Sequence, residues 1–105
     1  NLFDLIGAFK KILDTAPPEA VRITREALTV KDKISHIMEM LENNDTVRFE
    51  DLFNEDRSRI QIVVTFVALL ELIRLGLVRA YQENDFGNIW LINPQKKETQ
   101  IPVQG

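Results

Sequence analysis

Residues 57–75, RSRIQIVVTFVALLELIRL, constrain the fold of this chain more than any other stretch. They predict one long helix that is too apolar to need only one buried face. The broad apolar stripe of this helix consists of Ile62, Val63, Phe66, Leu69, Leu70 and Ile73, and a narrower strip consists of Val64, Ala68, Leu72 and Leu75. A surface helix of a small domain normally has a single apolar stripe. Two stripes therefore predict a core on one side and a partner on the other.

The composition limits the chain to one domain, or to one domain with an arm. It has 105 residues, of which 45% are hydrophobic, and few glycines or prolines, which is typical of an ordered chain. The net charge of −3 argues against a dedicated nucleic-acid binder. Without cysteine there is no disulfide or thiolate chemistry, and no apolar run is long enough to span a bilayer. We therefore expect a cytoplasmic protein without a membrane partner, and Asn1 in place of Met indicates a piece of a longer chain.

The first part of the chain predicts an amphipathic helix followed by a connector. Residues 2–15 place apolar side chains at helical spacing, and two prolines at 17 and 18 end that helix. In the connector, residues 21–24 alternate apolar with polar side chains and permit a short extended segment. The helix either folds back onto the domain or docks on another chain. The expected organisation is an N-terminal helical arm at 1–16, a linker at 17–29, a domain at 30–94 and a flexible tail at 95–105.

The predicted domain begins with a helix, a short strand and a short helix. The first helix covers about 30–43 and starts at a capping box formed by Thr29 and Asp32. Residues 46–48 then favour a short strand, and residues 49–53 favour a short helix. The residues of the short helix that we expect to face inward are Phe49, Leu52 and Phe53.

The long helix and a two-stranded wing complete the predicted domain. Asp56 is the expected N-cap of the long helix, and Gly76 follows its last turn. Residues 77–83 and 89–93 predict two strands joined by a glycine-containing loop. The order of elements predicts a fold that is mainly α with a small β wing: a winged helix-turn-helix preceded by an N-terminal amphipathic helix. The long helix takes the recognition position in this fold.

The long helix is poorly suited to reading DNA. A DNA-reading winged helix needs cations and hydrogen-bonding side chains along its recognition helix. Here Arg57 and Arg59 supply cations at one end only, and the helix beyond them is almost wholly apolar. Glu83 and Asp85 on the wing would repel phosphates.

No catalytic or metal site can be assembled from the sequence. The only histidine, His36, lies on a helix between apolar positions, where a packed or surface role is usual. Ser35 and Ser58 lie outside any nucleophile motif. The acidic residues around the short helix match no metal-binding loop, and there is no glycine-rich phosphate loop. We therefore expect no enzyme activity, no metal and no cofactor.

The wing carries aromatic side chains on one face. Tyr81 has the opposite strand parity to Val78 and Ala80, which we expect to face inward, and Trp90 alternates with apolar neighbours. One face of the hairpin should therefore belong to the core, and the other should be aromatic. Two roles are open for Trp90. It covers the edge of the core or the N-terminal arm, or it contacts a partner.

From Thr29 to Pro94 the chain resembles the C-terminal domain of bacterial segregation and condensation protein A (ScpA), the kleisin subunit of the SMC condensin complex. The segment TVKDKISHIMEMLENNDTVRFEDLF is similar to the first helix and the strand-helix of that family. The more specific match is V-x-T-F-x-A-L-L-E-L-I-[KR]-x-G-x-V-x-x-x-Q followed by F-G-[DN]-I. The arm at 2–15 is similar to the segment just ahead of the domain. Leu77 departs from the family, whose members often carry a polar residue there.

The resemblance implies a winged helix that docks on the cap side of an SMC ATPase head and, through the complex, takes part in chromosome condensation and segregation at the nucleoid. An adjacent central segment, mostly absent from this chain, binds ScpB, and DNA is reached only indirectly through the complex. The residues we expect at the SMC head are Ile62, Phe66, Leu70, Ile73, Arg74, Tyr81 and Trp90.

Three alternatives remain open from the sequence. If Phe66 and Leu70 both belong to the core, the outward contact residues are instead Val64, Ala68 and Leu72. The second alternative is that the chain is a DNA-binding winged-helix regulator. In that case its binding to duplex DNA should be sensitive to salt. The third alternative is a self-associating domain whose second stripe is a homodimer seam.

Overall fold

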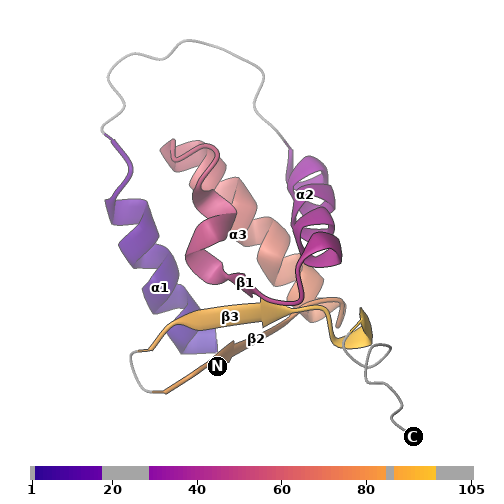
Figure 1. Cartoon of the computed structure of the whole chain (residues 1–105). Coiled ribbons are helices and arrows are strands. Elements are labelled where there is room, and N and C mark those ends of the chain that lie inside the picture. Colours follow the sequence, from indigo (N-terminus) through magenta and orange to yellow (C-terminus); the bar gives the residue numbers. More distant parts are fainter. Residues whose placement is uncertain (1, 18–28, 85–86, 97–105) are drawn as a thin grey trace, which may run out of the picture.

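The computed structural model describes residues 2–17, 29–84 and 87–96. Its elements, in chain order, are α1 (Leu2–Asp14), α2 (Val30–Asn43), β1 (Val47–Arg48), the 3₁₀ helix η1 (Phe49–Phe53), α3 (Arg59–Arg74), β2 (Arg79–Gln82) and β3 (Ile89–Ile92). The fold is mainly helical with a small three-stranded antiparallel sheet, a winged-helix-like arrangement that confirms the predicted fold class (Figure 1). The extended segment predicted at 21–24 and residues 97–105 of the predicted tail lie outside the described residues.

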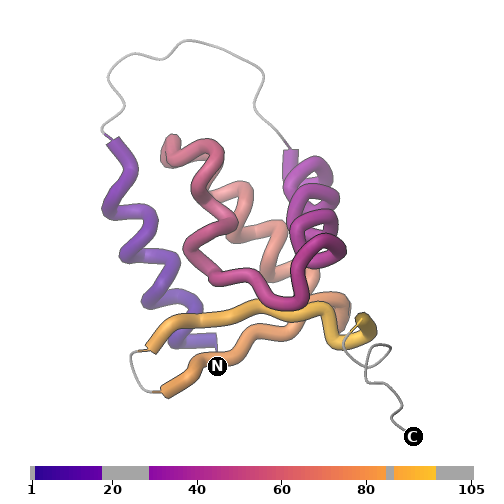
Figure 2. The backbone as a smooth tube through the Cα atoms, viewed as in Figure 1, coloured from indigo at the N-terminus to yellow at the C-terminus, as the bar shows by residue number. Residues whose placement is uncertain are grey.

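Helix α3 lies between α1 and α2 and packs against both, while the sheet lies across one end of the three helices (Figures 1 and 2). The central strand is β3, which pairs antiparallel with β1 on one side and β2 on the other. One row of the sheet joins Val47, Leu91 and Ala80. These side chains pack into the core, so the inner face of the sheet closes the end of the helical layer.

The capping box predicted for α2 is present. The Asp32 backbone N–H donates to the Thr29 hydroxyl oxygen at 3.1 Å, and the Thr29 backbone N–H donates to the Asp32 carboxylate at 3.0 Å. Two N–H groups that no helical carbonyl can reach are thereby satisfied. The Thr29 backbone N–H and the Thr29 hydroxyl both donate to the Asp32 carboxylate, and these two hydrogen bonds hold the pKa of the Asp32 carboxyl below its ordinary value.

The predicted N-cap of α3 is wrong by two residues. The N-cap is Ser58, whose side chain makes no capping hydrogen bond, and the helix begins at Arg59. The Asp56 carboxylate accepts the Ser58 backbone N–H at 3.0 Å. Asp56 therefore stabilises the turn ahead of the helix, a local side-chain bond that competes with capping in such residues.

Gly76 ends α3 as predicted. Its φ of +77° lies in the left-handed region, which glycine adopts without a steric cost. The Gly76 backbone N–H donates to the Ile73 carbonyl at 3.0 Å, and the Leu77 N–H donates to the Leu72 carbonyl at 2.9 Å. This pair of bonds is a Schellman motif, and it turns the chain sharply from the helix toward β2.

An aromatic cluster joins the N-terminal arm to the domain. The rings of Phe9 and Phe66 are stacked with centroids 4.1 Å apart, and Phe49 meets Phe66 edge-on at 6.3 Å. Near the other end of α1, Arg57 donates a hydrogen bond to the Thr15 hydroxyl at 3.0 Å. In the structure the arm therefore folds back onto the domain, one of the two alternatives that the sequence left open.

Residues just beyond position 94, where we predicted the domain to end, are still packed on the domain. Residues 94–96 are helical, and the Asn93 side chain accepts the backbone N–H groups of Gln95 and Lys96. The Lys96 ammonium donates to the carbonyls of Leu41 and Glu42 at 3.1 and 2.6 Å. A cation on the last carbonyls of α2 is favoured by the helix dipole, and it ties this segment to the domain.

Candidate protein-interaction surface

Helix α3 buries half of each apolar stripe. From the broad stripe, Ile62 and Leu69 are fully buried and Phe66 is nearly so. From the narrow strip, Ala68 and Leu72 are also fully or almost fully buried. The reason is that α1, α2 and η1 all pack around α3, so that seven of its 16 residues are buried. Neither stripe as a whole faces outward.

A different set of apolar side chains faces solvent on α3. We call Ile60, Val63 and Val67 the outward ridge; they are 53%, 37% and 45% exposed. Their spacing of three and four residues places them on one side of the helix. A valine or isoleucine gains free energy on leaving water, so a continuous apolar ridge on an ordered helix indicates a contact surface.

The sequence analysis missed Ile60 and Val67 as members of this surface. Val63 was assigned to the broad stripe, and the other two lie outside both predicted stripes. The signal was present, since residues 60, 63 and 67 are apolar at helical spacing. It was masked because α3 is apolar on nearly every side, and only the packing of the neighbouring helices shows which side stays free.

The seven predicted contact residues fall into different environments. Ile62 and Phe66 lie inside the core, which is the alternative that the sequence left open for Phe66. Leu70 and Ile73 are partly buried and pack against the core. Arg74 is exposed in the last turn of α3, next to the outward ridge. The remaining two, Tyr81 and Trp90, lie on the sheet.

An ion pair marks the C-terminal end of the outward ridge. The Arg74 guanidinium donates to both oxygens of the Glu71 carboxylate, from Nε at 3.1 Å and from Nη2 at 2.5 Å. These hydrogen bonds, together with the opposite charges of the two groups, lower the pKa of the Glu71 carboxyl and raise the pKa of Arg74. Both groups remain charged at neutral pH, so the apolar ridge is bordered by a charged and solvated end.

The outer face of the sheet carries the predicted aromatic side chains. In the register, Trp90 lies between Tyr81 on β2 and Arg48 on β1. Tyr81 is 44% exposed and Trp90 is half-buried, whereas Ile89 and Leu91 on either side of Trp90 are buried. The predicted alternation of the hairpin is therefore confirmed, and the outer face presents aromatic and cationic groups.

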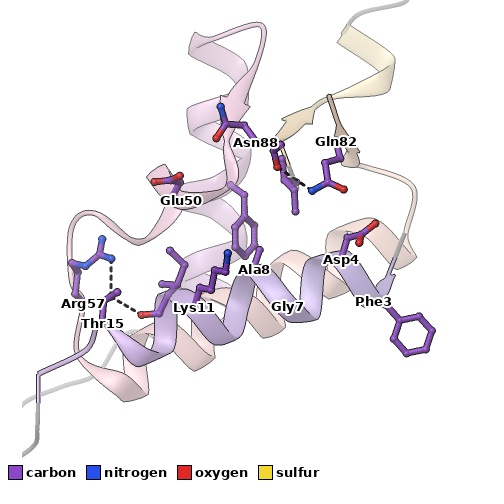
Figure 3. Close-up of a pocket in the computed structure, with 14 residues that line it drawn as sticks. Phe3, Asp4, Gly7, Ala8, Lys11, Thr15, Glu50, Arg57, Gln82 and Asn88 are labelled. Carbon is purple, nitrogen blue, oxygen red and sulfur yellow. Dashed lines mark hydrogen bonds between the residues drawn. The ribbon is translucent and has the colours of Figure 1, made fainter. Parts of the chain in front are cut away.

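A pocket of about 690 Å³ lies between α1, η1 and the wing (Figure 3). Gly7 and Ala8 line it from α1, and Phe49 forms a wall on the opposite side. The Arg57–Thr15 hydrogen bond closes one end, and the Gln82 side-chain amide donates to the Gly87 carbonyl at 3.0 Å at the other. Its lining residues include no histidine, serine or cysteine.

The described residues also offer little for metal binding or catalysis. No group of three or more histidine, aspartate or glutamate side chains comes together within them as a metal site. His36 lies 3.8 Å from the Glu55 carboxylate on the protein surface, away from the pocket lining. Among the helices that the structure describes, none has the length and apolar character of a membrane span.

Gln61 is one of three polar residues that are buried among the described residues, the others being Lys33 and Thr65. Gln61 is 3% exposed, and neither its amide nitrogen nor its amide oxygen has a hydrogen-bond partner among the described residues. Its backbone carbonyl accepts the Thr65 hydroxyl at 2.7 Å in addition to its helical role. The side chain cannot take part in DNA contact, because it faces the interior.

The chain is similar to a known family over nearly its whole length. The model of the family described as segregation and condensation protein ScpA matches residues 1–93. A segregation and condensation protein A from Bacillus pumilus is 34% identical over 99 residues, which cover 90% of this chain and 39% of the relative. The relative from Clostridium acetobutylicum is 31% identical over 98 residues, with 87% and 39% covered. The one from Caldanaerobacter subterraneus is 33% identical over 90 residues, with 84% and 36% covered. The chain thus spans little more than a third of the length of these relatives.

Proposed function

The chain belongs to the segregation and condensation protein A family, and on that premise we propose that it is the module through which such a protein docks on the ATPase head of an SMC partner. The module acts by binding and has no catalytic step of its own. Chromosome association at the nucleoid and contact with DNA follow indirectly, through the SMC complex. Contact with ScpB belongs to the adjacent central segment of the longer family protein.

The outward ridge is the observation that carries this proposal. Ile60, Val63 and Val67 are held on a regular helix whose opposite side is fixed in the core, so no loop has to be ordered on binding. Covering the part of one such side chain that is still exposed contributes about 1 kcal/mol. Val67 lies at the middle of α3, and side chains at the centre of an interface dominate its affinity.

The residues predicted for the SMC head take two roles in this proposal. Leu70, Ile73 and Arg74 lie nearer the C-terminal end of α3, and Tyr81 and Trp90 are paired on the sheet, where they offer aromatic surface. Ile62 and Phe66 lie behind the ridge and support it, because they fix α3 against its neighbours.

Val67→Arg tests the proposed surface directly. The side chain is 45% exposed, so an arginine there keeps its charge in water and the fold should be retained. Binding to the SMC head should weaken at least about thirtyfold, the effect of losing an interfacial anchor. The measurement is titration calorimetry with the cognate SMC head domain, after circular dichroism has shown that the variant is folded.

Phe3→Arg is the matched control for this variant. Phe3 is 80% exposed on α1, and its ring points away from the pocket (Figure 3). The control should bind the head as the unmodified chain does. Normal binding by folded Val67→Arg would contradict the proposed surface. A concentration-dependent dimer that Val67→Arg dissociates would instead assign the ridge to self-association.

A further inference from the structure

Strand β2 forms an open edge of the sheet. The strand order is β1-β3-β2, so β2 pairs with β3 on one side only (Figure 1). The Glu83 backbone N–H donates to the Asn88 carbonyl at 3.2 Å, which makes these two residues a hydrogen-bonded pair of the ladder. Because such pairs alternate along antiparallel strands, the backbone of Tyr81 also bonds to β3, whereas Ala80 and Gln82 do not. The backbone N–H and C=O groups of Ala80 and Gln82 therefore point away from the sheet.

These outward backbone groups are unpaired and reach the surface. Among the described residues, no hydrogen bond engages the backbone N–H or C=O of Ala80 or Gln82. Both residues are partly exposed, and Arg79 and Tyr81 beside them are exposed. A row of free N–H and C=O groups on an exposed edge is a template on which another extended strand pairs.

The side chains of this edge are complementary to a second copy of the same edge. Arg79, Tyr81 and Glu83 alternate with the residues between them, so they share the outer face of the sheet. Within the part of the chain that the structure describes, no hydrogen bond or ion pair engages the side chain of Arg79 or Glu83, and both are exposed. When two β2 strands lie antiparallel with residue 80 opposite residue 82, each Arg79 lies opposite a Glu83 and the two Tyr81 rings meet at the centre.

We propose that β2 pairs with the β2 strand of a second copy of this chain, which joins two three-stranded sheets into one sheet across a two-fold axis. Ala80 of each copy exchanges backbone hydrogen bonds with Gln82 of the other. Opposite charges and aromatic rings that face each other on neighbouring strands stabilise this register. A shift by two residues in either direction separates each Arg79 from its Glu83, so the charges select one register.

The inference goes beyond the proposed function, because the edge of β2 shares no residue with the outward ridge on α3. The pairing is symmetric and closes with two copies, so it does not propagate into a fibre. One short strand from each copy makes a smaller contact than a standard protein interface. We therefore expect a weak dimer that depends on the protein concentration.

A charge swap followed by sedimentation velocity of this chain alone tests the pairing. The unmodified chain should dimerise as its concentration rises toward about 1 mM, the range of a weak contact. Arg79→Glu places carboxylates opposite each other in both charge pairs, and Glu83→Arg does the same with guanidinium groups. Each variant should therefore weaken the dimer at least about tenfold. Mixing the two variants restores opposite charges in both pairs and should give a dimer that neither variant forms alone.

Two further measurements separate edge pairing from other effects of charge. Lys31→Glu is the matched control, since Lys31 is an exposed cation on α2, and it should dimerise within about twofold of the unmodified chain. Amide hydrogen exchange reads the backbone directly. The amides of Ala80 and Gln82 should exchange more slowly as the concentration rises, because the second copy then accepts their hydrogen bonds.

Either of two results would overturn the inference. One is a chain that stays monomeric over the whole concentration series. The other is a dimer that Arg79→Glu and Glu83→Arg, both shown to be folded by circular dichroism, form as well as the unmodified chain. If Val67→Arg dissociates that second kind of dimer, the contact lies on the outward ridge and not on the edge of β2.

Discussion

At the scale of single residues, Gln61 places an amide in the core without a hydrogen bond to any residue that the structure describes. A buried polar group without a partner loses the free energy of hydration and gains nothing in return. We predict that Gln61→Met, which keeps the length of the side chain, raises the free energy of unfolding by about 1–2 kcal/mol. Urea unfolding followed by circular dichroism measures this change.

Gln82→Met is the control for this prediction. Its side-chain amide donates to the Gly87 carbonyl, so the same substitution removes a hydrogen bond and should leave stability equal or lower by about 1 kcal/mol. If Gln61→Met is less stable than the unmodified chain, the amide of Gln61 has a stabilising role that the contacts do not show.

Asp32 gives the chain a pH-dependent contribution to stability. Hydrogen bonds from Thr29 lower the pKa of its carboxyl in the folded state, so the carboxylate stabilises α2 at pH values above the ordinary aspartate pKa of about 3.9. That stabilisation is lost as the pH falls through the lowered pKa. We predict that the unmodified chain melts at a higher temperature than Asp32→Asn at neutral pH. This difference in melting temperature should shrink as the pH falls into the acid range. A difference that stays constant down to pH values below the ordinary pKa would contradict the role given to the carboxylate.

At the scale of elements, one aromatic stack holds α1 against α3. Phe9 stacks on Phe66, and Leu5 is buried beside them in the core. We predict that Phe9→Ala lowers the free energy of unfolding by about 1–3 kcal/mol, the loss of a partly buried ring and its stacking partner. Thermal unfolding measures the change.

Phe3→Ala makes the same change on the exposed side of α1. Because this ring is 80% exposed, its removal should alter stability by less than about 0.5 kcal/mol. Equal stability of Phe9→Ala and the unmodified chain would show that α1 does not contribute to the core and that the arm serves another chain.

The elements were predictable where their signals are local. The Thr29–Asp32 capping box and the glycine that ends α3 are set by a few neighbouring residues, and both were found in the sequence. The start of α3 was not, because Asp56 and Ser58 both suit a cap and only the geometry of the turn decides between them. The docking of α1 on α3 also had to come from the structure, since its partner Phe66 is distant in sequence.

At the scale of the whole molecule, the candidate surface depends on how the helices pack around α3. The sequence shows that α3 is apolar on nearly every side, but α1, α2 and η1 decide which sides are covered. Ile62 and Phe66 thus enter the core, while Ile60 and Val67 stay outside it. Strand alternation is a simpler rule with two faces only, and for that reason the exposure of Tyr81 was predictable.

The arrangement gives two surfaces of different chemistry on one small domain. The outward ridge on α3 is apolar, and the outer face of the sheet is cationic and aromatic.

Titration calorimetry of this chain against the cognate SMC head domain, with a DNA duplex titrated in parallel at physiological salt, tests the central claim most directly. The account predicts that the chain binds the head at a ratio of one to one, and that titration with the DNA duplex gives no heat of binding. Binding of the duplex without binding of the head would contradict the account and would identify a winged helix that reads DNA.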